Sequence, residues 1–195
     1  QWWLTGRWGD AAATLRLHRA GDAVHLEAWG PGAEAALERA PSLLGDTDDP
    51  AGFVPRPGSV VASQWRVRGA HWRVPATGLA FQTAVQAVLE QKVTGVESRR
   101  SWFQLCREHG EPAHGPAPTG RWVAPDRHTV AGIPSWWWRS AGVDHARAGT
   151  VLRLARQRLP DHDAGALRAR LAAVRGIGPW TMAEVGFRAL GDADA

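Results

Sequence analysis

The segment Ala173–Met182 reads AVRGIGPWTM, and it decides how the second half of the chain folds. Apolar residues recur at helical spacing on both sides of it. Gly176 suits the position just past a helix end, and Pro179 suits the first turn of a new helix. The spacing therefore predicts a helix over residues 163–175, a tight GIG turn, and a second helix that runs to about residue 190.

The two glycines of this turn indicate a binding function for the backbone. Glycine permits positive φ and lets a ligand approach closely. The N–H groups around Gly178 to Thr181 would lie at the positive end of a helix dipole, which suits one phosphate oxygen. A dinucleotide-binding loop needs a third glycine and a preceding strand, and a nucleotide-hydrolase loop needs Gly-Lys, so neither fits. An ordinary helix–helix turn stays open on this motif alone.

Composition indicates a folded protein with a basic balance. The chain has 195 residues, 44% of them hydrophobic, with a formal net charge of +4. Lys92 is the sole lysine, so arginine supplies the positive charge. Arginine pairs bidentately with phosphate, which favours a polyanionic partner, although high-GC codon usage produces the same bias. The single cysteine, Cys106, excludes internal disulfides and four-cysteine zinc or iron–sulfur sites.

Targeting signals are missing from the sequence. No apolar run approaches the length needed to span a membrane, and no charged-then-apolar leader opens the chain. We therefore expect a cytoplasmic protein without a membrane partner. The chain begins with Gln1 rather than Met, and the WWLTGR that follows resembles the interior of a longer sequence. We therefore expect a fragment at both ends.

The first part of the chain, residues 1–57, predicts a small, partial α/β domain with its connector. Alternating residues from Ala13 to His18, a Gly21-Asp22 turn and a second run up to Trp29 predict a β-hairpin, to which strand character is confined. A short helix is expected over residues 33–40, ended by Pro41. Glycine and proline then punctuate residues 43–58, which predicts a connection.

The second part, residues 58–195, predicts an all-helical domain, so the fold class is mainly α. Asp126 and Asp163 are expected to cap helix N-termini, and residues 111–120 are expected to form a surface loop. Four apolar stripes at helical spacing are expected to be buried: Phe81, Ala84, Val85, Val88 and Leu89; Trp102, Phe103 and Cys106; Val151, Leu152, Ala155 and Leu159; Leu167, Leu171 and Val174.

Two separated motifs carry a family resemblance. VRGIGPWTM, together with AVLEQKVTG at Ala87–Gly95, resembles the helix-hairpin-helix DNA glycosylase superfamily, in particular its bacterial 3-methyladenine DNA glycosylase II branch. The resemblance extends from about Pro41 to the end of the chain. It implies a helical glycosylase domain with its hairpin over about residues 163–190, preceded by a small β-rich domain. It also implies a monomer that needs no cofactor, with a monovalent cation at the hairpin carbonyls left open.

The resemblance assigns roles to the hairpin. Backbone amides around Gly176, Gly178 and Thr181 would anchor a DNA phosphate, which is independent of base sequence. Trp180 would lie at the base pocket, where relatives that also cut the DNA backbone carry a lysine that forms a Schiff base. An indole has no amine, so a monofunctional enzyme is implied. Its face would favour a base made cationic by alkylation by about 0.5–2 kcal/mol. The alternative is an indole that packs in the core.

The turn in LEQKVTG matches the family's wedge loop. Lys92, with Gln91 and Val93, would fill the space left by the flipped base. A lysine departs from a simple apolar plug, but its stem can pack while its ammonium reaches a phosphate. A solvated lysine in a helix–helix turn is the alternative. Arg99 and Arg100, just after this turn, are expected to contact phosphates.

The catalytic residue is expected outside the sequence. The family uses an aspartate about twenty residues after the matching tryptophan to stabilise an oxocarbenium-like sugar and to position water. The sequence ends with GDADA at residues 191–195, so the expected aspartate lies about five residues beyond Ala195, and the domain is expected to be C-terminally incomplete. Asp192 and Asp194 lie too early for that role.

Other clusters are less specific. Trp136, Trp137 and Trp138 with Arg139 could form an aromatic and basic patch that faces DNA. Three successive tryptophans cannot all share one helix face, so at least one is expected in the core. His145 and Arg147 begin a helix, where a contact with phosphate stays open, and a solvated helix face is the expectation. No histidine spacing predicts a metal site.

The resemblance, taken with these residues, implies a monofunctional DNA glycosylase that flips and excises alkylated purines of the 3-methyladenine type in base excision repair. Its partner would be double-stranded DNA with alkylated bases, in the cytoplasm at the bacterial nucleoid. A non-catalytic helix-hairpin-helix DNA-binding module is the alternative. A helical scaffold with an incidental GIG turn is a third, weaker one.

Overall fold

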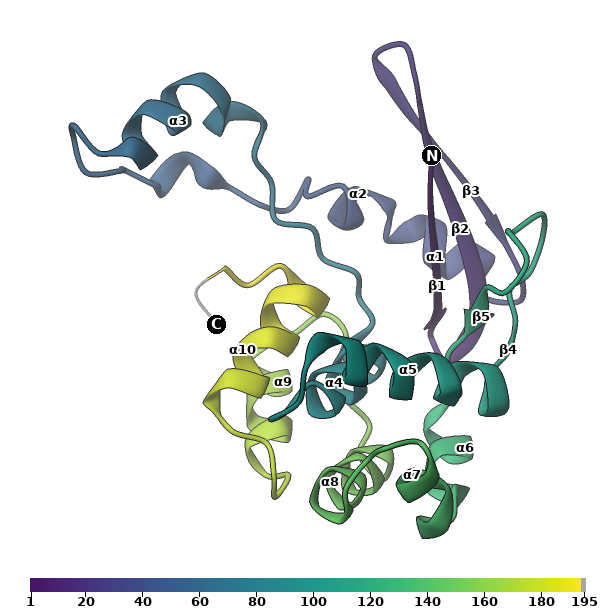
Figure 1. Ribbon diagram of the computed structural model, residues 1–195. Helices are drawn as coiled ribbons and strands as arrows, with labels where there is room; N and C mark the ends of the chain where they lie inside the picture. The colour runs from purple at the N-terminus through teal and green to yellow at the C-terminus, as the bar shows by residue number, and fades with distance from the viewer. Residues whose placement is uncertain (194–195) are drawn as a thin grey trace.

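A computed structural model describes residues 1–193 of the chain (Figure 1). The N-terminal part contains β1 (Trp2–Trp8), β2 (Ala11–Ala20), β3 (Ala23–Trp29), α1 (Ala33–Glu38), α2 (Ala40–Leu43), η1 (Pro50–Gly52), α3 (Val60–Arg68) and η2 (Gly69–His71). The remainder contains α4 (Ala80–Leu89), α5 (Gly95–His109), β4 (Glu111–Pro112), β5 (Trp122–Val123), α6 (Arg127–Gly132), α7 (Ser135–Ser140), α8 (His145–Ala155), α9 (Ala164–Ala172), α10 (Pro179–Val185) and η3 (Gly186–Leu190). The chain is therefore mainly helical with a small N-terminal sheet, as predicted.

The N-terminal sheet has three antiparallel strands in the order β1-β2-β3. The predicted hairpin between β2 and β3 is confirmed, with Ala20 paired to Ala23 across the Gly21-Asp22 turn. The prediction that strands are confined to this hairpin is wrong, because β1 pairs along β2 through a second two-residue turn. That turn is Gly9-Asp10, with φ of +61° and +68°, as tight hairpins require.

Two boundaries near the sheet differ from the prediction. The helix expected over residues 33–40 is two helices, and Pro41 lies in the first turn of α2 rather than ending a helix. Proline is tolerated there because first-turn N–H groups have no helical acceptor. The predicted surface loop 111–120 begins in a strand, since Glu111 pairs with Val123. This β4–β5 ribbon is tied to the sheet by a 2.7 Å hydrogen bond from Thr5 Oγ1 to the Trp122 carbonyl.

The helical body is built around α4. Its buried residues join one hydrophobic cluster with residues of α5 to α10, and a separate cluster of Trp8, Ala13, Leu15, Ala36 and Leu79 lies under the sheet. The predicted apolar stripes are largely buried, with Val88, Val151 and Leu167 at 0–1% exposure. Phe103 is an error of the prediction, since it is 63% exposed. The face of α5 that packs is turned toward Ser98, Ser101 and Leu105 instead.

Polar caps fix the helix starts. Asp126 and Asp163 cap α6 and α9 through their carboxylates, as predicted. Thr94 and Glu97 form a reciprocal capping box at the start of α5. The hydroxyl of Thr94 accepts from the Glu97 N–H at 3.3 Å, and the Glu97 carboxylate accepts from the Thr94 N–H at 2.9 Å. These caps set the entry angle of α5 directly after the predicted wedge loop.

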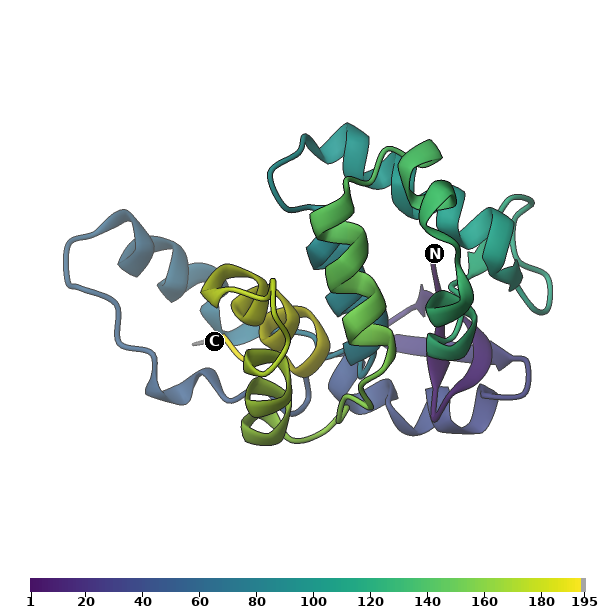
Figure 2. The same cartoon turned by 90° about the horizontal axis from the view of Figure 1, so that it is seen from below.

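Residues 53–72, which include α3, extend away from both the sheet and the helical body in the two views (Figures 1 and 2). The ring of Trp65 contacts those of Phe53 and Trp72 edge to face, with centroids 4.8 and 5.8 Å apart. Among residues 1–193, no helix combines the length and apolarity needed to cross a membrane.

Candidate nucleic-acid interface

The GIG turn reverses the chain between α9 and α10. α9 ends at Ala172 rather than at the predicted residue 175, and the Ile177 N–H then bonds the Val174 carbonyl at 3.1 Å. Gly176 has φ of +101°, and a Cβ on it would lie 2.1 Å from Thr150 Oγ1. An L-residue would be both strained and in collision there, so this turn requires glycine.

Gly178 plays a different part in the same turn. It caps the N-terminus of α10 at φ −108°, and nothing lies within 4 Å of the place its Cβ would occupy. Neither strain nor packing calls for glycine here, but the open space lets a ligand approach the backbone. Pro179 fills the first turn, and no side chain caps the helix. The amides of Trp180 and Thr181 therefore have no helical acceptor and suit an anion.

The turn between α4 and α5 lies against the hairpin. Lys92 at its tip is exposed and has φ of +55°. The Gln91 side-chain amide donates to the Gly176 carbonyl at 3.1 Å and to Thr181 Oγ1 at 2.9 Å. The structure thus brings together the two motifs that the sequence singled out, through one side chain.

Helix α8 binds a carbonyl beside each of these two loops. Arg147 is 7% exposed and donates through Nη1 to the Leu89 carbonyl at 3.0 Å, while its Nε bonds the Asp144 carboxylate at 2.6 Å. Arg153 Nε donates to the Arg175 carbonyl at 2.9 Å. The prediction of a solvated Arg147 is wrong, because its guanidinium satisfies the carbonyl end of α4 inside the protein. The hydrogen bonds from Arg147 also stabilise the charged form of Asp144 and lower the pKa of its carboxyl group.

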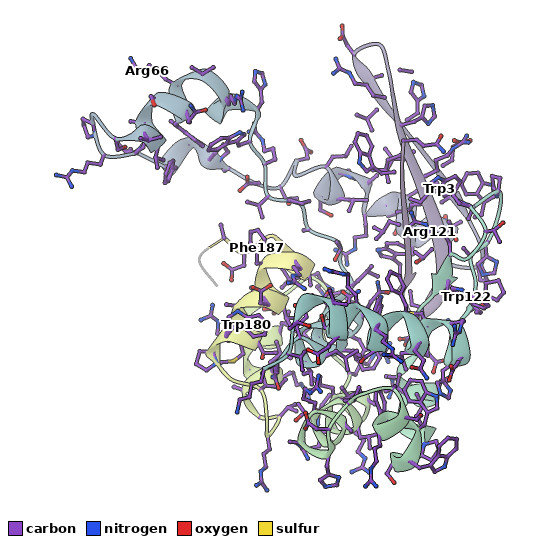
Figure 3. All side chains as sticks on the ribbon, viewed as in Figure 1. Trp3, Arg66, Arg121, Trp122, Trp180 and Phe187 are labelled. Atoms are coloured by element: carbon purple, nitrogen blue, oxygen red, sulfur yellow. The ribbon has the colours of Figure 1, made fainter. Side chains whose placement is uncertain are left out.

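Trp180 is 50% exposed, which excludes the alternative of a core-packing indole. Phe187, further along the same helical segment, is 47% exposed. Figure 3 shows both aromatic residues on the α10–η3 segment, away from the sheet. The helix therefore offers two aromatic side chains to solvent next to the hairpin.

An ion-pair network that the sequence analysis missed joins this helix to α4. Arg188 donates through Nη1 and Nη2 to the Glu90 carboxylate at 3.2 and 3.0 Å, and its Nη2 lies 2.6 Å from Glu184. Burial lowers the pKa of Arg188, but Glu90 and Glu184 more than offset this and raise it above its usual value. The i,i+4 spacing of Glu184 and Arg188 is a readable signal, whereas the pairing with Glu90 is not.

No family model and no curated protein sequence matches the chain. The structure is similar to a 3-methyladenine DNA glycosylase from Archaeoglobus fulgidus, with a TM-score of 0.69 at 14% identity over 97% of this chain and 68% of that one. The chain has the fold of the helix-hairpin-helix DNA glycosylases.

Two DNA-bound structures also have this glycosylase fold. MBOgg1 in complex with a low-affinity DNA ligand matches with a TM-score of 0.67 at 12% identity, over 93% of this chain and 67% of that one. The Clostridium acetobutylicum 8-oxoguanine glycosylase/lyase in complex with double-stranded DNA matches with a TM-score of 0.60 at 10% identity, over 92% and 66%. The likeness confirms the fold that the resemblance implied.

Within the glycosylase fold, the remaining predicted residues fall into two groups. Val93 is half-buried in the wedge turn, and Arg99 and Arg100 are exposed in the first turns of α5. Their contacts with DNA stay predictions. Trp137 and Trp138 are buried at 4% and 1% exposure, which confirms that the tryptophan run contributes to the core, and Trp136 is exposed.

The aspartate expected beyond Ala195 lies outside the described residues, as does Asp194. Asp192 is described, and its carboxylate lies 3.7 Å from Arg168. In residues 1–193, no group of three or more His, Cys, Asp or Glu could hold a metal ion. The carboxylate of Glu184 lies on α10, the same helix as Trp180.

Proposed function

We propose that the protein is a monofunctional DNA glycosylase that flips alkylated purines of the 3-methyladenine type out of duplex DNA and excises them. The observation that carries the proposal is the pair of hydrogen bonds from Gln91 to Gly176 and Thr181. They join an exposed turn, suited to fill a gap in the base stack, to a hairpin suited to hold a phosphate. Base flipping needs both elements at one place.

The hairpin would supply the grip. First-turn amides of α10 would donate to a phosphate oxygen, and the open space at Gly178 would let the DNA backbone come close. Lys92 would insert its stem from the wedge turn, while its ammonium reaches a neighbouring phosphate. Arg99 and Arg100 would add sequence-independent phosphate contacts, so binding would weaken as salt rises.

The choice of chemistry rests on Trp180. Relatives that cut the DNA backbone have a Schiff-base lysine at this position, and tryptophan cannot form one. Its exposed indole would favour a cationic base by about 0.5–2 kcal/mol. Similar structures include both 3-methyladenine and 8-oxoguanine enzymes. An alkylated purine suits the tryptophan, because alkylation makes the base both cationic and a better leaving group.

Cleavage would also need a carboxylate beside the sugar to stabilise positive charge and hold water. On the family resemblance that residue lies beyond Ala195. A non-catalytic DNA-binding module is the second candidate, since the hairpin and the wedge turn alone would bind and distort a duplex. In either case we propose that the protein is a monomer that acts on chromosomal DNA in the cytoplasm.

The test is base release from defined duplexes. The full-length protein, with the residues that follow Ala195, is incubated with duplexes that contain 7-methylguanine, 3-methyladenine or 8-oxoguanine, and free bases are separated by chromatography. Release of methylated bases with intact strands is expected. Borohydride trapping should give no covalent complex, because tryptophan stands where relatives that cut the backbone carry the Schiff-base lysine. Salt-sensitive binding without release would favour the module, and no binding would refute both.

A further inference from the structure

One face of α10 and η3 combines aromatic and acidic side chains. Trp180 and Phe187 are both about half exposed, and Glu184 lies between them in sequence. Trp180 and Glu184 are four residues apart in α10, so they project from the same side of that helix, and Phe187 follows in the π-helical segment η3. Exposed aromatic faces beside a carboxylate attract a cation through the ring quadrupole and through charge.

The carboxylates outnumber the cation that joins them. Arg188 holds Glu90 through both terminal nitrogens and Glu184 through Nη2 alone. Two carboxylates on one guanidinium leave one unit of negative charge within this ion-pair network, and the exposed Arg99 lines the same hollow on the Glu90 side. The Glu184 side chain is 27% exposed and that of Glu90 is 32% exposed, so water screens this charge only in part.

Glu184 is not needed to satisfy Arg188. The bidentate pair with Glu90 already joins η3 to α4, and this is the stronger geometry. The contact between Arg188 and Glu184 is made at Oε2, and the Glu184 side chain is partly exposed to solvent. Arg188 therefore holds the Glu184 carboxylate in place and leaves it accessible to a ligand.

We propose that Glu184, positioned by Arg188, is a specificity-determining residue that makes the base pocket prefer a positively charged base over a neutral one. This rests on the proposed function, in which Trp180 lies against the flipped base. It adds a charge to that platform, and it places the source of the preference in a carboxylate as well as in the indole. Removing the charge should therefore lower selectivity while the grip on undamaged duplex stays the same.

The test is a ratio of affinities for two duplexes. One contains 7-methylguanine and the other guanine, both on a 2′-fluoroarabino sugar, which resists glycosidic cleavage so that binding can be measured. Wild-type protein should prefer the cationic duplex. Glu184→Gln should lower that preference about three- to fivefold, in the range of a partly exposed ion pair. Glu184→Asp, which keeps the charge, and Glu38→Gln, which removes an exposed carboxylate from α1, should retain it.

Each outcome decides. An unchanged ratio in Glu184→Gln overturns the inference, even if the protein releases methylated bases and the proposed function holds. Wild-type protein that shows no preference for the cationic duplex overturns the inference too. If that protein still releases neutral lesions, it is a glycosylase whose selectivity has another source. If Glu184→Gln fails to fold in a melting scan, Glu90→Gln removes the same unit of charge from the α4 side. It should lower the ratio as well, and an unchanged ratio there refutes the inference.

Discussion

Replacement of Gly176 by alanine should destabilise the protein strongly. At φ +101° an alanine carries backbone strain of about 1–3 kcal/mol. Its Cβ would also lie 2.1 Å from Thr150 Oγ1 and 3.1 Å from Thr150 Cβ, so Thr150 must move. Such overpacking costs about 1–3 kcal/mol. The displaced hydroxyl also accepts from Arg153 Nη2 at 3.0 Å. We expect a total loss of about 3–5 kcal/mol, a large part of the stability of an ordinary domain.

The assay is urea unfolding followed by tryptophan fluorescence, with Gly178→Ala as the matched control. Gly178 has ordinary φ and open space at its Cβ, so alanine there should change the free energy of unfolding by less than about 1 kcal/mol. It should instead weaken duplex binding, because the methyl group occupies the space that a phosphate would enter. A loss below about 1 kcal/mol in Gly176→Ala would refute the steric reasoning. Unchanged affinity in Gly178→Ala would refute the hairpin as an anchor.

Three further measurements follow from the structure. Gln91→Ala removes two hydrogen bonds, so it should lower the free energy of unfolding by about 1–2 kcal/mol and abolish base flipping. Flipping is measured by 2-aminopurine fluorescence, and normal flipping would contradict the coupling of the wedge turn to the hairpin. Burial raises the pKa of the Cys106 thiol to about 12, so it should react with a disulfide reagent only on unfolding, and fast native labelling would contradict this. Burial also raises the pKa of Asp161, so its contribution to stability is complete below about pH 3.9 and is lost as pH rises through its folded value. Asp161→Asn should therefore be more stable than wild type at pH 7 and equal to it at pH 3 in urea unfolding, and equal stability at both would refute the effect.

Local patterns predicted local structure well. Asp126 and Asp163 cap helices because a side-chain oxygen three residues from an N–H is a short-range arrangement. The Gly21-Asp22 hairpin followed from the same kind of signal. Gly9-Asp10 carries that signal too, but the tryptophan-rich run before it does not alternate in polarity, so β1 was missed. Phe103 was misplaced because an apolar residue at helical spacing need not face the core when serines provide the packing face.

Long-range pairing could not be predicted in this way. Gln91 and Thr181 are separated by most of the helical body, and their contact depends on how α10 packs on α4. The same packing brings Glu90 to Arg188. Arg147 looked like a solvated residue because arginine at a helix start usually is one. Only the placement of the α4 carboxyl end beside α8 explains its burial.

The two arginines of α8 have a consequence for how a target would be selected. Arg147 and Arg153 bind the backbone next to the wedge turn and next to the hairpin, and six residues of helix rise about 9 Å. Because a helix is stiff over that length, α8 holds the wedge turn and the hairpin at a fixed separation. A duplex bound by both would have to adapt to the protein rather than the reverse. Binding would then favour sites where the duplex is easily deformed, such as those with weakened stacking at a damaged base. This preference would act before any atom of the lesion is contacted.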